Sequence, residues 1–331
     1  MKVFVNRVIS PSGVEIMKNA GISVDQWTEK REITPDELIQ ICKNYDGLII
    51  AGRNKIDKTF LNACRHLKVI ALHSVGYDHV DVEEATRLKI PIGNTPGVLS
   101  AATADVAFFL MMAVARKAFF MHKRILKGEW RFFEPTANLG MDLEGKTLGI
   151  FGLGKIGMEV ASRCRKTFEM PVIYCNRHPN TEAEEKLGAV RVSFDELLRQ
   201  SDVLSVHSVL SEETAGLFDR HAFSRMKNSA IFINTARGGI HNEEDLVAAL
   251  NNKTIWGAGL DVTNPEPMKP DNPLLFMENV AVLPHIGTAT LETREKMVSI
   301  VAKNIIAGLA GQPIPYAVNP QIYGSEQERV V

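Results

Sequence analysis

The chain has 331 residues, of which 45% are hydrophobic and 23% charged, and its formal net charge is −1. This length exceeds a single ordinary core and predicts two domains, while the balanced charge gives no basic surplus for binding nucleic acid or an anionic membrane. Four scattered cysteines lack metal-ligand spacing, so we expect reduced thiols and no metal site. The longest apolar run, 106–115, is about half of what a membrane-spanning helix needs, which favours a cytoplasmic protein.

The first hundred residues alternate between short apolar runs and helical patterns. Strands are expected at 3–5, 47–50 and 68–72, and helices at 13–20, 34–43 and 58–64. In the second of these helices, Thr34 followed three residues later by Glu37 forms a capping box. Alternation of this kind predicts a parallel sheet with helices on its faces.

One long helix is expected at 100–126, after a hinge loop at Pro96-Gly97. Its first half is apolar nearly all round, and such a helix must be covered on every side. A domain junction or a subunit interface would cover it, which makes a homodimer one of the expectations.

A second alternating series follows this helix. Strands are expected at 147–151, 172–175, 203–207, 230–234, 257–260 and 280–283, and helices at 155–166, 193–200 and 243–251. A last helix at 290–309 is expected to pack back on the first domain. The sequence therefore predicts an α/β fold with two Rossmann-like or flavodoxin-like parallel-sheet domains. The expected domains are 1–99 with 287–331, and 100–286.

A glycine-rich motif lies between the predicted strand at 147–151 and the helix that follows it. In Gly152-Leu153-Gly154-Lys155-Ile156-Gly157, the first glycine permits a tight turn, the second lets the backbone approach a pyrophosphate, and the third lets the helix lie close to the sheet. The helix N-terminus then offers N–H groups and partial positive charge to the phosphates. This context predicts a dinucleotide cofactor.

The end of the next strand refines the choice of cofactor. An acidic residue usually stands there to bind the ribose 2′-hydroxyl of NAD, but here the sequence is Asn176-Arg177-His178. An asparagine does not repel a 2′-phosphate, and an arginine can bind it through two hydrogen bonds. We therefore expect a preference for NADP(H), with NAD(H) possible, although Arg177 could also be an ordinary surface charge.

Three further segments follow predicted strands, and they carry Arg237, Glu266 and His285. Reduction of a keto group needs a fixed cation to hold the substrate and polarise its carbonyl. It also needs a proton donor that works near neutral pH, and a carboxylate beside that donor to favour its protonated form. The three residues supply these requirements together, although each would be weak support alone.

With these motifs the chain resembles the D-isomer-specific 2-hydroxyacid dehydrogenase family, and within it the glyoxylate/hydroxypyruvate reductases. The resemblance extends from the N-terminus to about Val318, and it includes Ser74-Val75-Gly76-Tyr77-Asp78-His79 and Pro284-His285-Ile286-Gly287. It implies that Arg237 binds the substrate carboxylate and keto oxygen, that His285 is the general acid, and that Glu266 orients and tunes His285. It also implies that the backbone of Val75 and Gly76 binds substrate, that Ala236 and Asp261 hold the nicotinamide carboxamide, and that the chain forms a homodimer. By the same resemblance, the domain of residues 1–99 with 287–331 would bind substrate, the domain of residues 100–286 would bind NAD(P), and the active site would lie in the cleft between them. The expected cofactor-binding residues are Thr103, Gly152, Gly154, Lys155, Ile156, Gly157, Asn176, Arg177, His178, Ala236, Asp261 and Gly287.

Two positions depart from the family pattern, and they bear on a cofactor-lining loop and on the choice of substrate. Val209 stands where a proline is usual, and Phe133 stands where similar hydroxypyruvate reductases have a tryptophan, although Trp130 matches a neighbouring aromatic position.

Two alternative functions stay open. A D-3-phosphoglycerate dehydrogenase would share the three catalytic residues, with Arg53 and Lys55 as candidates for binding its phosphate. A non-catalytic, NAD(H)-sensing protein of the corepressor type would also share the fold.

Overall fold

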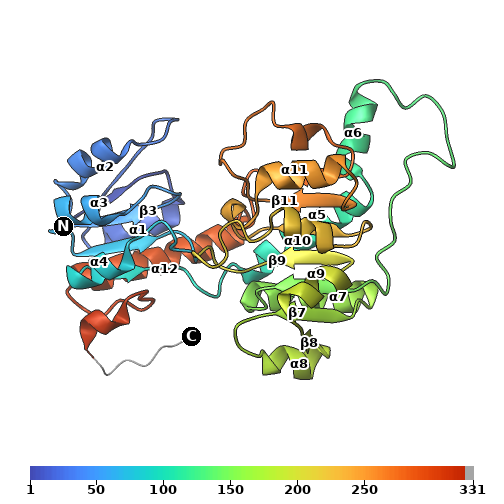
Figure 1. Ribbon diagram of the computed structural model, residues 1–331. Coiled ribbons are helices and arrows are strands. Elements are labelled where there is room, and N and C mark those ends of the chain that lie inside the picture. Colours follow the sequence, from blue (N-terminus) through green and yellow to red (C-terminus); the bar gives the residue numbers. More distant parts are fainter. Residues whose placement is uncertain (325–331) are drawn as a thin grey trace. The chain divides into compact units, whose positions relative to one another are not determined.

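The computed structural model describes residues 1–324, and the chain divides into two units. Unit 1 consists of residues 1–99 and the described residues from Ala289 onward, and unit 2 consists of Ser100–Thr288. Each unit is an α/β domain built on a parallel sheet (Figure 1). The two-sheet α/β fold expected from the sequence is therefore confirmed.

Unit 1 contains a five-stranded parallel sheet in the order β2-β1-β3-β4-β5. The strands are β1 (Lys2–Val5), β2 (Ser23–Gln26), β3 (Gly47–Ile50), β4 (Val69–Leu72) and β5 (Ile92–Gly93). Helices α1 (Pro11–Asn19) and α12 (Leu291–Leu309) share one apolar core with this sheet, and α2 (Pro35–Cys42), α3 (Lys58–Ala63) and α4 (Val82–Arg87) share the other. The predicted capping box is present, with Thr34 as the N-cap of α2.

Unit 2 contains a seven-stranded parallel sheet in the order β12-β11-β10-β9-β6-β7-β8. The strands are β6 (Leu148–Phe151), β7 (Val172–Cys175), β8 (Val190–Arg191), β9 (Val203–Val206), β10 (Ile231–Asn234), β11 (Gly257–Leu260) and β12 (Val280–Val282). The chain runs from β6 outward to β8 and then returns to β9, so the strand order reverses between β6 and β9. In open parallel sheets, ligands bind at the carboxyl ends of the strands beside such a reversal.

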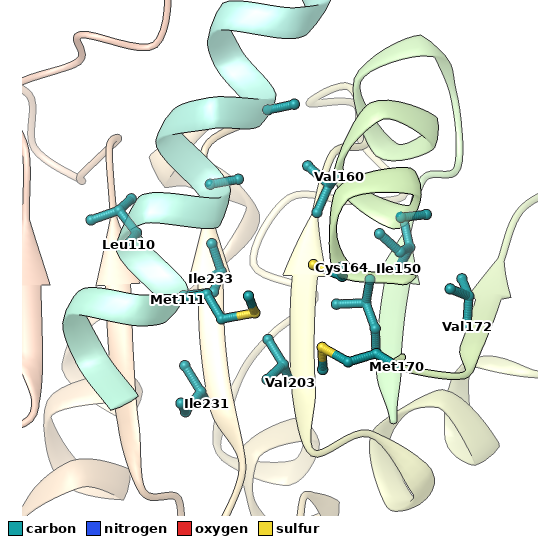
Figure 2. Packing of buried hydrophobic residues seen from close by; sticks show 14 of the residues in the cluster. Leu110, Met111, Ile150, Val160, Cys164, Met170, Val172, Val203, Ile231 and Ile233 are labelled. Atoms are coloured by element: carbon teal, nitrogen blue, oxygen red, sulfur yellow. The ribbon is translucent and has the colours of Figure 1, made fainter. Parts of the chain in front are cut away.

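Helices cover both faces of this second sheet. Helix α5 (Ser100–Ala115) and α7 (Lys155–Phe168) pack on one face, where Leu110, Met111 and Val160 meet the strands (Figure 2). Helices α9 (Phe194–Gln200), α10 (Arg220–Arg225) and α11 (Glu243–Asn251) share the core on the other face. A further helix of this half, α8 (Thr181–Leu187), follows β7.

The single long helix predicted at 100–126 is wrong. The chain forms α5 and then α6 (Ala118–Leu126), and the break lies at Lys117, whose φ of +51° is left-handed. The side chain of Lys117 pairs with Glu278 at 3.3 Å and lies over the ring of Trp256, and these contacts hold the chain at the break.

The chain itself leaves part of the apolar half of this predicted helix exposed. Phe109 remains 49% exposed and Met112 remains 42% exposed. Among residues 1–324, no helix is long and apolar enough to cross a membrane.

Candidate active site

The glycine loop between β6 and α7 has an open side at its second glycine. Gly152 has φ +91°, and a Cβ there would lie 2.6 Å from the backbone nitrogen of Ser208. A Cβ on Gly157 would lie 2.9 Å from the carbonyl oxygen of Gly152, whereas a Cβ on Gly154 would meet nothing within 4 Å. Gly154 is also the N-cap of α7 and contributes no capping side chain. The tight turn and the open helix N-terminus fit the pyrophosphate of a dinucleotide.

The turn after β7 is held by side chains that belong to the protein itself. The amide of Asn176 bonds both backbone groups of Leu153, accepting from its N–H at 2.6 Å and donating to its carbonyl at 3.2 Å. The guanidinium of Arg191 donates to the carbonyl oxygens of Asn176 at 2.9 Å and Arg177 at 2.7 Å. The exposed side chain of Arg177 forms an ion pair with Glu213. Asn176 therefore supports the glycine loop, and the side chain of Arg177 is exposed at this turn.

The loop that carries Arg237 is organised by Asn234, the buried last residue of β10. Its Oδ1 accepts from the N–H of Ala236 at 2.9 Å, and its Nδ2 donates to the carbonyl of Arg237 at 2.9 Å. The same Nδ2 lies 3.0 Å from Nδ1 of His241. Burial lowers the pKa of His241 to about 4, so its ring is neutral at neutral pH and Nδ1 can accept this bond.

His285 and Glu266 form a direct pair. Nδ1 of His285 lies 2.6 Å from Oε1 of Glu266, with side chains 41% and 18% exposed. Arg237, Glu266 and His285 follow β10, β11 and β12, which are neighbouring parallel strands, so all three leave the same edge of the sheet. The Arg237 and Glu266 loops are closely packed, because a Cβ on Gly238 would lie 2.0 Å from the carbonyl oxygen of Thr263.

Asp261 holds the segment that carries His285. Its carboxylate is buried and accepts from the N–H of Ile286 and from the N–H of Gly287, each at 2.8 Å. Burial raises the pKa of Asp261, and the two backbone bonds act in the opposite direction. His285 has φ +55°, in the left-handed region. We call the two hydrogen bonds from Ile286 and Gly287 to Asp261 the Asp261 clamp. Thr103 of α5 lies beside this clamp, because a Cβ on Gly287 would lie 3.4 Å from the methyl group of Thr103.

Glu243, at the start of α11, supports the loop that carries Glu266. Its carboxylate accepts from the N–H of Asn264 at 3.1 Å and from the side-chain amide of Asn272 at 2.6 Å. These bonds fix the segment on both sides of Glu266.

In unit 1, the loop after β4 contains Val75 and Gly76. The hydroxyl of Ser74 donates to the carbonyl of Gly76 at 2.8 Å, and the amide of Asn94 donates to the carbonyl of Val75 at 2.9 Å. The loop is therefore fixed by its own polar side chains at the carboxyl end of a strand.

The catalytic and cofactor-binding residues expected from the sequence all lie in unit 2. Lys155 and Ile156 are in the first turn of α7, and His178 is exposed after β7. The sequence reasoning missed several residues that hold these groups, and no motif marks them because their partners are distant or in ordinary loops. They are Arg191, Glu213, His241 and Glu243, with Asn234 recognised only as part of a segment. Across residues 1–324, no group of three His, Cys, Asp or Glu side chains could hold a metal ion.

Comparison with known proteins finds relatives that cover nearly the whole chain. Residues 108–287 match the family described as D-isomer specific 2-hydroxyacid dehydrogenase, NAD binding domain. A glyoxylate reductase from Thermococcus litoralis is 40% identical over 328 residues, which is 98% of each chain. The chain belongs to the D-isomer-specific 2-hydroxyacid dehydrogenase family. The resemblance found in the sequence is therefore confirmed, and the protein is an NAD(P)-dependent oxidoreductase.

Two solved structures extend this match to the whole fold. A glyoxylate reductase from Paecilomyes thermophila has a TM-score of 0.85 at 34% identity, covering 97% of this chain and 99% of that one. An NADPH-dependent glyoxylate/hydroxypyruvate reductase from Sinorhizobium meliloti, solved with NADP and malonate, has a TM-score of 0.82 at 28% identity, covering 100% and 99%.

Proposed function

We propose that this dehydrogenase reduces glyoxylate or hydroxypyruvate to the D-2-hydroxy acid, with Arg237, Glu266 and His285 as its catalytic residues. The observation that carries the proposal is the 2.6 Å contact between His285 and Glu266 at the sheet edge from which Arg237 also leaves. The similar proteins from Thermococcus litoralis and Sinorhizobium meliloti support the choice of substrate, because they are glyoxylate or glyoxylate/hydroxypyruvate reductases.

The roles of the three residues follow from their chemistry. The guanidinium of Arg237 binds the substrate carboxylate and polarises the keto oxygen. Nδ1 of His285 faces Glu266, so Nε2 is the ring nitrogen that gives a proton to the keto oxygen. The contact with Glu266 fixes the orientation of the imidazole ring.

The cofactor is held by the glycine loop and the turn after β7. When bound, the reduced nicotinamide supplies the hydride, and the carbonyl carbon becomes the C–H of the hydroxy acid. We propose that NADPH is preferred, because Asn176 replaces the acidic residue that would select NADH and the exposed Arg177 follows it. The NADPH-dependent reductase from Sinorhizobium meliloti supports this preference.

Turnover is the direct test. Purified protein should consume NADPH with glyoxylate or hydroxypyruvate, followed by the loss of reduced-nicotinamide absorbance, and should be slower with NADH. The variant His285→Gln should lose about 10²–10⁴-fold in kcat, because the proton donor is gone, while its affinity for NADPH stays near that of the wild type.

The matched control is His221→Gln, which changes an exposed histidine on α10. Activity only with 3-phosphohydroxypyruvate would replace the proposed substrate by the phosphorylated one. Turnover of His285→Gln equal to that of the control would contradict the catalytic role.

We also propose that the chain forms a homodimer through α5, α6 and the segment that follows, which leaves the body of unit 2 as an extended loop (Figure 1). Large apolar side chains are exposed along this stretch: Phe109, Met112, Ile125, Leu126, Trp130, Phe132 and Phe133. An exposed apolar surface of this kind is typical of a protein interface.

A further inference from the structure

Arg177 and Glu213 meet from two different strands of the unit 2 sheet. Arg177 follows β7 and Glu213 lies in the loop after β9, and these strands flank β6 on either side. Their ion pair therefore lies across the end of β6, where the glycine loop begins. The two side chains are 70% and 72% exposed, so both charges are accessible to a ligand.

The backbone on both sides of this pair is fixed. In the Glu213 loop, the hydroxyl of Thr214 accepts from the N–H of Ser211 at 2.8 Å and donates to the carbonyl of Val209 at 2.7 Å. The turn that carries Arg177 is held by the guanidinium of Arg191. Hydrogen bonds therefore hold the backbone that carries each of the two side chains, which keeps Glu213 near Arg177.

The two charges favour different ribose substituents. A 2′-phosphate carries a charge of about −2 near neutral pH, so it is attracted by Arg177 and repelled by Glu213. A 2′-hydroxyl is a hydrogen-bond donor that a carboxylate accepts, as in ordinary NAD sites. Asn176 stands where that carboxylate usually is, but its amide bonds the backbone of Leu153. Glu213 is the carboxylate that the fold brings to this turn.

We propose that Arg177 and Glu213 form a cofactor-selecting pair, in which Arg177 binds the 2′-phosphate of NADPH and Glu213 accepts from the 2′-hydroxyl of NADH. This inference rests on the proposed cofactor site. NADPH binding replaces the Arg177–Glu213 contact by a contact between Arg177 and the phosphate. When NADH binds, the carboxylate of Glu213 accepts a hydrogen bond from the 2′-hydroxyl. Glu213 thus limits the preference for NADPH and allows the protein to use both cofactors.

Opposite effects on two cofactors provide the test. Dissociation constants would be measured by calorimetry for NADPH, NADH and the fragment 2′,5′-ADP. Glu213→Gln should bind NADPH and 2′,5′-ADP about three- to tenfold more tightly and NADH several-fold more weakly. Arg177→Ala should bind NADPH and 2′,5′-ADP more weakly, whereas its affinity for NADH should stay nearly unchanged. The gain of Glu213→Gln should shrink as salt is added.

Glu212→Gln is the matched control, because it removes an equal charge from the neighbouring exposed residue of the same loop. Equal changes for NADPH and NADH in Glu213→Gln, or the same gain in Glu212→Gln, would overturn the proposal. If Arg177→Ala loses NADPH while Glu213→Gln changes nothing, the pair is overturned but the NADPH preference stands. If the wild type prefers NADH and Glu213→Gln weakens NADH binding, the proposed preference for NADPH is contradicted but the role of Glu213 stands.

Discussion

At the scale of single residues, the proposed catalytic His285 depends on a neighbouring side chain, Asp261, that fixes its segment of backbone. His285 has a left-handed φ of +55°, which is uncommon for a residue with a side chain. The two hydrogen bonds from Ile286 and Gly287 to the carboxylate of Asp261 fix the backbone immediately after it. A carboxylate can accept both bonds at once because it has two oxygens and no donor.

Replacing Asp261 by asparagine should therefore break the clamp. The amide keeps one accepting oxygen but turns an NH₂ group toward the other backbone N–H, so one buried donor loses its partner. We expect a loss of about 1–3 kcal/mol in the free energy of unfolding and a lower kcat, because His285 is held less firmly. Urea unfolding and steady-state kinetics measure the two effects.

The control for this change is Asp271→Asn, which alters an exposed carboxyl in the loop after Glu266. Asp261→Asn with the stability and kcat of that control would show that the clamp is not needed.

The sequence identified the residues with chemical roles better than the residues that hold them. The glycine loop and Arg237, Glu266 and His285 belong to recognisable motifs, because the chemistry demands those residue types in a fixed context. Glu213 and Arg177 are separated by 36 positions, and only the folded sheet places them together. No local pattern could have predicted that pair.

At the scale of elements, glycines decide how closely helices approach the unit 2 sheet. A Cβ on Gly257 of β11 would lie 2.4 Å from the carbonyl oxygen of Asn279 and 2.7 Å from Val114 of α5. Gly154 differs, because a Cβ there would point into open space. Gly257 therefore allows close packing, and Gly154 leaves room for a ligand.

Two alanine substitutions should separate these roles. Gly257→Ala should lose about 1–3 kcal/mol of unfolding free energy, because the backbone of Asn279 must move. Gly154→Ala should keep nearly the wild-type stability but bind NADPH much more weakly, because its methyl group occupies the approach to the N-terminus of α7. Thermal unfolding and cofactor titration measure the two variants together. A destabilised Gly154→Ala with normal NADPH affinity would reverse the assignment.

Element prediction succeeded where apolar runs were long and failed where elements were short or interrupted. The central strands of both sheets were expected from their apolar runs, whereas β2, β5 and β8 were missed. Two of these have only two residues, and β2 (Ser23–Gln26) is a partly polar edge strand. The break between α5 and α6 was missed because Lys117 is held by Glu278 and Trp256, which are distant in sequence.

At the scale of the whole molecule, the exposed apolar residues on α5 and α6 bear on how copies of the chain associate. An apolar side chain that stays in water costs free energy, and burial against a second copy would recover it. The double variant Phe109→Asp/Met112→Asp puts two charges on this surface. We expect the wild type to be a dimer and the variant a folded monomer, measured by light scattering after size-exclusion chromatography.

The control is Val190→Asp, which places a charge on an exposed apolar residue of β8 (56% exposed) outside the proposed interface. A monomeric wild type, or a dimer that survives the double variant, would place the association elsewhere or exclude it. Circular dichroism distinguishes a folded monomer from an unfolded chain. Because the mutated residues lie apart from the glycine loop and the His285–Glu266 pair in sequence, a folded monomer that still binds NADPH would show that the cofactor site of unit 2 is complete in one chain.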